Sequence, residues 1–241
     1  MEISLTGKRV FITGATGAIG GAILKALKES GAWVAGSYFQ SEEEAARLMG
    51  QGVFMVQADL SDRARARGCV ASVLEQGPLD ALIYAAGNTR DRTIFRLTDS
   101  DWDDVRGLHL DGLVACTQAV LPAMRERKSG KLIAVGSLSG SIGRAGQANY
   151  SAVKAATVAF VKSVAREAGR FGITANVILP GFVDSRMTRA APPAAWERAK
   201  ADSALGTISS AETVASFAAW LLSDLAQGVT GQIFQLDSRV V

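Results

Sequence analysis

Cysteine and histidine are scarce in this sequence, and long apolar runs are missing. The 241 residues include one histidine and two cysteines, Cys69 and Cys116, which lie far apart without a CxxC pattern. So few ligands at such spacing predict no metal site. No apolar stretch approaches the length of a membrane span, and the first residues lack the basic region and apolar run of a secretory signal. We therefore expect a cytoplasmic protein that does not bind membranes.

Dense clusters of charge are also missing. The formal net charge is +3, without a concentrated basic run or the aromatic residues interleaved with Lys and Arg that nucleic-acid binding favours. We therefore expect no nucleic-acid partner. A hydrophobic content of 48% with 20% charged residues is typical of a globular chain rather than a disordered one.

What the sequence does contain is an alternation of two patterns. Between helical patterns, in which apolar residues recur every three or four positions, lie short apolar runs typical of buried strands. These runs occupy residues 9–13, 33–37, 53–58, 79–87, 131–137, 173–180 and 232–236. The alternation predicts a single-domain α/β fold with a doubly wound sheet of about seven parallel strands and helices on both faces. The expected strand order is 3-2-1-4-5-6-7.

A glycine-rich turn, TGATGAIGGAILKAL, follows the first predicted strand and precedes a helix. Glycines allow a tight turn and a close approach of a pyrophosphate to the helix N-terminus, where free N–H groups favour an anion. A plain strand-to-helix turn is the alternative, but the position in the first βα unit favours dinucleotide binding. The candidate cofactor contacts in this turn are Gly14, Thr16, Gly17, Ala18, Ile19 and Gly20.

The second predicted strand ends in SYFQ, where a site for NAD would usually offer an acid to the ribose hydroxyls. No acid is present there. Ser37, Tyr38 and Gln40 could accommodate a 2′-phosphate, although no arginine stands beside them. The glutamates that follow are explained by a capping box between Ser41 and Glu44 at the start of the next helix. The predicted cofactor is NADPH, with NADH not excluded.

Tyr150 and Lys154 lie four residues apart in QANYSAVKAA, so they share one face of a predicted helix. A phenol with a pKa near ~10 is a poor acid or base at neutral pH, and a nearby cation lowers that pKa. One helical turn supplies such a cation. The alternative is a core tyrosine beside a solvated lysine.

Together these motifs resemble those of the short-chain dehydrogenase/reductase family, and within it the β-ketoacyl-acyl-carrier-protein reductase group. The resemblance runs through the glycine turn, ADL, AAGNTRD, GS, GQANYSAVKA, GITANVILPGFVDSRMT and a GQ near the C-terminus. It implies a Rossmann-type fold over residues 1–241, a nicotinamide cofactor and a Ser–Tyr–Lys site. The cofactor half would cover about residues 1–130, and the catalytic and substrate half about residues 131–241.

The resemblance assigns a role to each matching residue. Tyr150 would protonate a carbonyl oxygen, Ser137 would orient that oxygen, and Lys154 would contact Tyr150 and the nicotinamide ribose. Asp59, with Leu60 beside it, would contact the adenine, and its alternative role is to begin the next helix. The other implied contacts are Ala85, Ala86 and Gly87 after the fourth strand and Pro180, Gly181 and Val183 after the sixth, with Ser185 and Thr188 as candidate amide contacts.

Two residues depart from the pattern of that group. Ala18 stands where a glycine is usual, so the spacing TGxxGxxG looks more like the epimerase and dehydratase branch, and the added methyl could weaken pyrophosphate binding. His109 replaces an asparagine that helps to hold a proton-conducting water. A lone histidine on an apolar stripe is commonly a core residue. An imidazole accepts and donates hydrogen bonds and titrates near pH ~6.5, so we hypothesise that His109 replaces the asparagine in the relay of protons to the lysine. The alternative is a damaged relay and a slow or inactive enzyme.

The predicted partners are a second copy of the chain and an acidic carrier. The helix over residues 149–168 is apolar on more than one face, which predicts an oligomer, and the family resemblance implies a homotetramer. A basic rim would suit an acyl carrier protein, although Phe171 stands where a docking arginine is common, and ordinary solvated charges are the alternative. The rim residues are Arg125, Arg127, Lys128, Lys131, Arg166 and Arg170.

The leading hypothesis is an NADPH-dependent ketoreductase that reduces a β-ketoacyl thioester, of acyl-carrier-protein or CoA type, to the β-hydroxyacyl form in fatty acid or polyketide biosynthesis. Tyr150 is its general acid. One alternative is a reductase or dehydrogenase of another small ketone or secondary alcohol, of polyketide or sugar type. The other is a cofactor-binding subunit with little activity, which Ala18 and His109 suggest.

Overall fold

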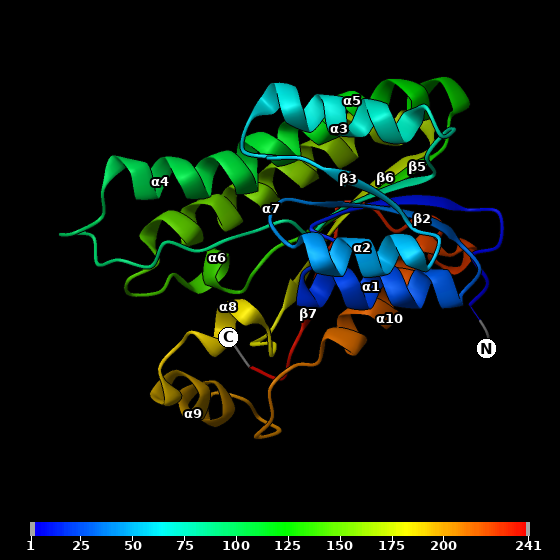
Figure 1. Ribbon diagram of the computed structural model, residues 1–241. Helices are drawn as coiled ribbons and strands as arrows, with labels where there is room; N and C mark the ends of the chain where they lie inside the picture. Colours follow the sequence, from blue (N-terminus) through cyan, green and yellow to red (C-terminus); the bar gives the residue numbers. More distant parts are fainter. Residues whose placement is uncertain (1–2, 240–241) are drawn as a thin grey trace.

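One parallel sheet organises the chain (Figure 1). The computed structural model describes residues 3–239, apart from the side chains of Arg186 and Met187. The strands are β1 (Arg9–Thr13), β2 (Trp33–Tyr38), β3 (Phe54–Gln57), β4 (Ala81–Tyr84), β5 (Gly130–Val135), β6 (Ile173–Pro180) and β7 (Ile233–Leu236). They lie in the order β3-β2-β1-β4-β5-β6-β7 and are all parallel. The predicted doubly wound α/β fold and its strand order are therefore confirmed.

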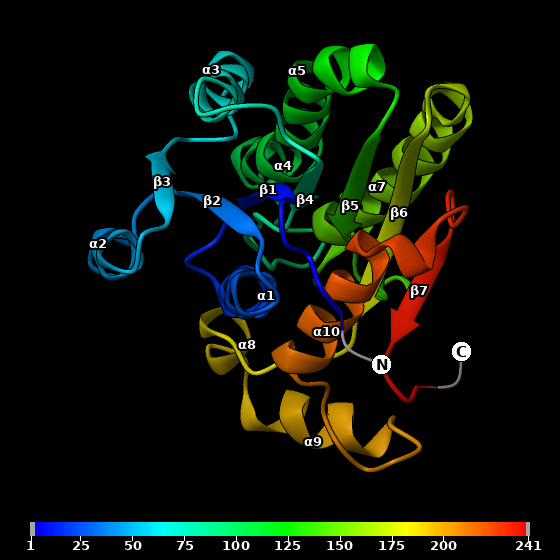
Figure 2. The ribbon, with the colours of Figure 1, turned by 90° about the vertical axis from the view of Figure 1, so that its right-hand side faces the viewer.

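Helices cover both faces of the sheet (Figure 2). On one face pack α1 (Ala18–Glu29), α2 (Glu42–Gly50) and α10 (Ala211–Leu222). On the other lie α3 (Arg63–Leu74), α4 (Asp99–Arg106), α5 (Gly112–Arg127) and α7 (Ala148–Ala168). The short elements are the π-helical turn η1 (Gly107–Asp111), the 3-10 turns η2 (Gly169–Phe171) and η3 (Asp224–Ala226), and the helices α6 (Ser139–Ile142), α8 (Arg186–Arg189) and α9 (Pro193–Ala201).

Alternation along the central strands divides the core in two. Phe11 and Leu82 are fully buried in the cluster that contains α3, α5 and α7, whereas Ile12 and Ile83 are fully buried in the cluster that contains α1 and α10. The same residues pair across β1 and β4. Burial of each side chain contributes about 2 kcal/mol. Because both faces are covered, these strands have continuous apolar runs instead of a polar face.

The strand order reverses between β1 and β4, which are neighbours in the sheet although β2 and β3 separate them in the chain. In open parallel sheets a crevice forms beyond the carboxyl ends of the strands at such a point. The glycine turn follows β1, and residues 85–87 follow β4, so the fold brings both segments to this crevice. Within residues 3–239, none of the helices has the length and apolar character needed to cross a bilayer.

Two helix starts differ from the sequence predictions. Ser41 does occupy the N-cap of α2, but its side chain makes no capping hydrogen bond, and Glu44 pairs with Arg47 at 2.6 Å. The capping-box prediction is therefore wrong. Asp62 caps α3 by accepting hydrogen bonds from the backbone N–H groups of residues 64 and 65. Asp59 thus does not begin the helix, and that alternative for it is wrong as well.

Candidate active site

The turn after β1 requires glycine for two separate reasons. Gly14 has a φ of +67°, and a Cβ there would lie 2.8 Å from the Cα of Ala86. The N–H of Gly17 donates to the carbonyl of Gly14 at 3.0 Å, which closes the turn. A side chain at Gly14 would push the ends of β1 and β4 apart. The turn therefore sets the width of the crevice.

The N-terminus of α1 is open. Gly17 stands at the N-cap, no side chain caps it, and the first turn has no acid. The leading N–H groups of a helix lack partners within the helix, so this end suits a phosphate. Ala18, the first residue of α1, is exposed, whereas Gly20 is buried against the carbonyl of Gly14. These residues fit the pyrophosphate of a dinucleotide.

Ser37 lies beneath this turn rather than beside a ligand. Its side chain is 1% exposed, and its hydroxyl accepts a hydrogen bond from the N–H of Gly14 at 3.3 Å. The carbonyl of Ser37 accepts a second one from Ala15 at 2.9 Å. Ser37 thus holds the turn in place, and its predicted contact with a 2′-phosphate does not fit this burial. Tyr38, the last residue of β2, is partly exposed.

Thr13 joins the two central strands at the crevice. Its buried Oγ1 accepts hydrogen bonds from the backbone N–H groups of Ala85 and Ala86, at 3.0 and 3.1 Å. These bonds continue the pairing of β1 with β4 beyond the sheet. Ala85 and Ala86 are small, so the backbone after β4 stays accessible beside the glycine turn.

The structure brings Ser137, Tyr150 and Lys154 together. Ser137 follows β5, and the other two lie in the first turns of α7. Lys154 is 6% exposed; its Nζ donates to the carbonyl of Val135 at 2.7 Å and lies 5.6 Å from the centroid of the Tyr150 ring. The end of β5 and one helical turn therefore converge on a single position.

Burial dominates the electrostatics of this group. It raises the pKa of Tyr150, while hydrogen bonding from Ser137 and the charge of Arg144 act in the opposite direction. Burial also lowers the pKa of Lys154 to about 7. The sequence predicted that the lysine would lower the phenol pKa, but burial raises it, and the charges that act on it are those of Asp91 and Arg144. The phenol therefore holds its proton at neutral pH.

His109 lies in η1 and contacts the same group. Its ring is 2% exposed and stands edge-on to the Tyr150 ring, with the centroids 5.3 Å apart. Nε2 lies 2.8 Å from the carbonyl oxygen of Asn88 and 3.0 Å from its amide nitrogen, so either tautomer finds a partner there. Nδ1 is buried and has no hydrogen-bond partner within residues 3–239.

The charge state of His109 differs from the sequence prediction. Burial, followed by the positive charge of Lys154, lowers the imidazole pKa to about 3. The predicted titration near pH ~6.5 assumed a solvated ring and is wrong for this environment. His109 is neutral across the physiological range. Gly87 leaves room for it, because a Cβ at Gly87 would lie 2.6 Å from His109 Cε1.

Asn149 is a site residue that sequence reasoning missed. It is fully buried; its Nδ2 donates to the carbonyls of Arg90 and Asp101, both at 3.1 Å, and its Oδ1 accepts the N–H of Tyr150 at 2.8 Å. Asn149 thereby fixes the first turn of α7 against α4 and the segment that precedes it. The signal was present, because this asparagine stands directly before the tyrosine in QANYSAVKAA.

The segment after β6 packs against the residues that follow β7. A Cβ on Gly181 would lie 2.5 Å from the Cβ of Asp237, so glycine is needed there. Val183 is buried. The Ser185 and Thr188 side chains form a reciprocal cap on α8, with N–H to hydroxyl distances of 2.9 and 3.1 Å. The predicted contacts of Ser185 and Thr188 with an amide would need hydroxyl groups that already make the hydrogen bonds of this cap.

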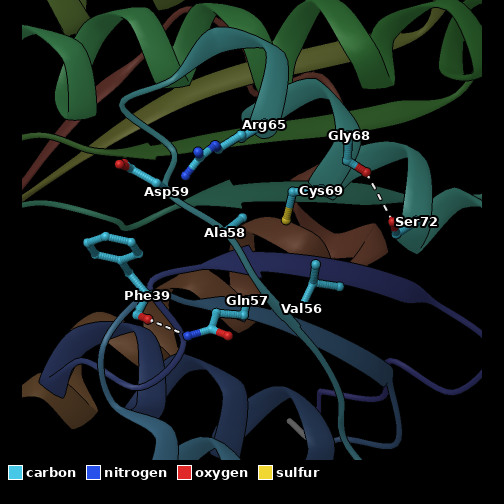
Figure 3. A pocket seen from close by; sticks show the side chains of 9 residues that line it. All are labelled: Phe39, Val56, Gln57, Ala58, Asp59, Arg65, Gly68, Cys69 and Ser72. Atoms are coloured by element: carbon cyan, nitrogen blue, oxygen red, sulfur yellow. Dashed lines mark hydrogen bonds between the residues drawn. The ribbon is translucent and has the colours of Figure 1, made fainter.

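A pocket of about 500 Å³ opens between the end of β3 and α3 (Figure 3). It is lined by Phe39, Val56, Gln57, Ala58, Asp59, Arg65, Gly68, Cys69 and Ser72. The carboxylate of Asp59 accepts the N–H and the hydroxyl of Ser61 at 3.0 and 2.6 Å. The neighbouring Leu60 is buried in the core. Asp59 thus lines this pocket with its carboxylate held in a fixed orientation.

Known proteins share this architecture along the whole chain. A family model described as Enoyl-(Acyl carrier protein) reductase matches residues 14–238. The 3-oxoacyl-(acyl-carrier-protein) reductase FabG of Staphylococcus aureus is 35% identical over 237 residues, which cover 95% of this chain and 96% of that protein. The chain belongs to the short-chain dehydrogenase/reductase family.

Other members of the family support the same conclusion. The acetoacetyl-CoA reductase of Synechocystis sp. is 33% identical over 239 residues, 98% of each chain. The crystal structure of gox2181 matches with a TM-score of 0.92 at 29% identity and covers 98% of this chain and 96% of its own. As a short-chain dehydrogenase/reductase, the protein is an NAD(P)-dependent oxidoreductase acting on a ketone or alcohol. The predicted family and enzyme class are therefore confirmed.

Proposed function

We propose that the protein is an NADPH-dependent reductase of β-ketoacyl thioesters. The observation that carries the proposal is the convergence of Ser137, Tyr150 and Lys154 at the crevice beside an open helix N-terminus. The curated relatives named for 3-oxoacyl-acyl-carrier-protein and acetoacetyl-CoA reduction support the thioester class. The description of the matching family model names an enoyl reductase instead, so the test includes that reaction.

Each side chain has a defined role in this reaction. A nicotinamide cofactor held at the glycine turn and the N-terminus of α1 would supply the hydride for the carbonyl carbon. Tyr150 donates its phenolic proton to the carbonyl oxygen, and Ser137 donates a hydrogen bond to that oxygen. Lys154, with a pKa of about 7, is poised to return a proton to the phenolate at neutral pH. The products are the β-hydroxyacyl thioester and the oxidised cofactor.

Burial keeps Tyr150 protonated at neutral pH, which is the form that reduction of a carbonyl requires. The raised pKa also makes the phenol a weaker acid, so transfer of its proton depends on the neighbouring Ser137 and Lys154. The proposal of a ketoreductase therefore rests on the arrangement of these three residues and not on the direction of the pKa shift.

His109 takes the relay position as a neutral ring. It fixes the backbone at Asn88 through Nε2 and packs edge-on against Tyr150. Its unpartnered Nδ1 is the atom that would hold a water leading toward Lys154, since a buried polar nitrogen without a partner is costly. The relay needs a hydrogen-bonding ring here and does not need a charged one.

The carrier-docking surface is smaller than the sequence predicted. The Lys131 ammonium donates to the carbonyls of Leu221 and Ser223 at 2.9 and 2.7 Å, so it is not available to a partner. Arg125 and Arg170 flank the ring of Phe171, with guanidinium to centroid distances of 5.9 and 4.8 Å. Docking of an acyl carrier protein, if the substrate is carrier-bound, would use these two arginines.

The protein is also proposed to be a homo-oligomer. Ile94 and Phe95, just before α4, are 63% and 95% exposed, and Trp102 of α4 is 39% exposed. Such exposed large side chains are costly in a monomer and are typical of an interface. In α7 one apolar face is buried within the chain, whereas Ala155 and Ala159 are exposed, as the prediction of a second, intermolecular face requires. Light scattering measures the state directly.

The test of the reaction is the substrate range of the purified protein. Oxidation of NADPH would be followed with an acetoacetyl thioester, a crotonyl thioester and a simple ketone such as acetone. We expect turnover of the acetoacetyl thioester at least roughly tenfold faster than the other two. Faster reduction of crotonyl thioester would identify an enoyl reductase. Turnover of simple ketones alone would favour the small-ketone alternative, and binding of cofactor without turnover would favour the inactive subunit.

A further inference from the structure

The pocket beside α3 contains a cation that the reaction does not use. Arg65 lies in the first turn of α3, where its backbone N–H binds the Asp62 carboxylate at 3.0 Å. Its side chain is 68% exposed and lies 4.0 Å from that carboxylate, a long and solvent-exposed pairing. Such a pairing is worth little, so the guanidinium remains available to another anion.

The side chain of Arg65 is directed toward the segment that follows β3. Figure 3 shows its guanidinium reaching back from α3 toward the segment that carries Asp59, at the end of the pocket where the ring of Phe39 projects. The carboxylate of Asp59 does not pair with this guanidinium, because it accepts hydrogen bonds from the N–H and the hydroxyl of Ser61. Phe39 immediately follows β2, which is the strand whose end faces the adenosine ribose in this fold.

A phosphate that binds at the end of β2 needs a cation beside it. The end of β2 has no arginine, and Ser37 is buried beneath the glycine turn. The first turn of α2 carries three glutamates, of which Glu44 alone is paired with an arginine within the described residues. These negative charges would repel a 2′-phosphate. The compensating charge must come from another element.

We propose that Arg65 recognises the 2′-phosphate of the adenosine half of the cofactor and so selects NADPH over NADH. Guanidinium suits this task because it stays charged and binds phosphate through two parallel N–H groups. The residue that selects the cofactor would then lie on α3, across the pocket, instead of at the end of β2. This inference rests on the dinucleotide assignment of the crevice but not on the identity of the carbonyl substrate.

The test measures binding of cofactor fragments and needs no turnover. Adenosine 2′,5′-bisphosphate and 5′-AMP would be titrated by calorimetry into the wild type, Arg65→Ala and Arg63→Ala. Arg63 is the matched control, because it is exposed on the same helix and does not line the pocket. We expect the wild type and Arg63→Ala to bind the bisphosphate roughly tenfold more tightly than AMP. Arg65→Ala should lose this preference while its affinity for AMP stays within about twofold.

A second experiment measures the same binding preference at different ionic strengths. The preference of the wild type should shrink between 50 and 500 mM salt, as expected for an exposed charge pair at roughly these concentrations. Arg65→Lys should keep part of the preference, since it keeps the charge without the planar fork.

Three results would overturn the inference. The first is an Arg65→Ala variant that retains the wild-type preference. The second is a variant that binds both fragments equally less tightly, which would make Arg65 a general contact rather than a selector. Failure of the wild type to bind either fragment would remove the dinucleotide assignment as well. By contrast, a normal preference in a protein that leaves the acetoacetyl thioester unreduced would support Arg65 and reject only the proposed substrate.

Discussion

The imidazole of His109 stands at 89° to the phenol ring of Tyr150, and the two centroids are 5.3 Å apart. This edge contact links η1 to α7 at the point where the proposed proton donor sits. The same imidazole holds the backbone at Asn88. A change at His109 therefore affects the position of Tyr150 as well as any path for protons.

His109 is the single histidine of the chain, so its charge can be measured without ambiguity. Burial lowers its pKa to about 3, and an ¹⁵N-labelled sample should show a neutral ring with no titration between about pH 5 and 8. The NMR spectrum also reports the tautomer. An imidazole that titrates near ~6.5 would mean that the ring is hydrated and the relay is charged.

Substitutions separate positioning from proton transfer at this residue. His109→Asn keeps a hydrogen-bonding group and should retain kcat within about tenfold, whereas His109→Phe keeps the ring but should lose roughly a hundredfold. The pH dependence of kcat in His109→Asn should follow the wild type, since the imidazole carries no charge there. Equal kcat for His109→Phe and the wild type would reject a relay role.

Lys154→Met should stabilise the protein while abolishing activity. Burial lowers the lysine pKa from 10.5 to about 7. A shift of this size corresponds to a penalty on the order of 5 kcal/mol below pH ~7, partly offset by loss of the bond to Val135 in the variant. Between about pH 7 and 10.5 the unfolded chain binds the extra proton, so the wild type gains stability as pH rises and the difference shrinks.

Urea denaturation at pH 6.5 and pH 9.5 measures this effect. The expected result is a variant that is more stable by several kcal/mol at the lower pH and less so at the higher. A variant that is less stable than the wild type at pH 6.5 would show that Lys154 is hydrated in solution.

Asn149→Ala should impair positioning of Tyr150. The substitution removes an acceptor for the Tyr150 N–H and leaves the carbonyls of Arg90 and Asp101 without their donor. We expect a loss of about 2 kcal/mol in stability and a fall in kcat of tenfold or more with little change in KM for the cofactor. Ser163→Ala, on the exposed face of the same helix, is the control. A variant with normal kcat would remove Asn149 from the site.

Gly14→Ala and Gly7→Ala form a matched pair. Both glycines have positive φ, +67° and +80°, so each alanine costs about 1–2 kcal/mol in strain. Among residues 3–239, a Cβ at Gly7 meets nothing within 4 Å, whereas one at Gly14 collides with Ala86. Calorimetry should show cofactor binding unchanged in Gly7→Ala and lost in Gly14→Ala. Equal affinities in the two variants would place the phosphate turn elsewhere.

The fold was predictable because its signals are local. The apolar runs of the strands and the glycine turn lie within single segments, and Tyr150 and Lys154 meet through one helical turn. Properties that depend on the surroundings were not predictable in the same way. The His109 pKa and the position of Ser37 follow from burial, which is set by distant elements.

Contacts between residues far apart in the sequence account for the remaining differences between the sequence predictions and the structure. Lys131 looked like a surface cation, but its ammonium binds the C-terminal carbonyls of α10, about ninety residues away in the sequence. Arg65 is exposed on α3, and its relation to Phe39 across the pocket emerges only in three dimensions. No spacing rule within one segment connects such residues.

The most direct measurement is the oxidation of NADPH by the pure protein with an acetoacetyl thioester, compared with Tyr150→Phe. The variant keeps the ring against His109 and removes only the proton donor. We expect unchanged cofactor affinity and a loss of turnover of at least roughly a thousandfold. Comparable turnover in the wild type and Tyr150→Phe would contradict the central claim that Tyr150 is the acid of this site.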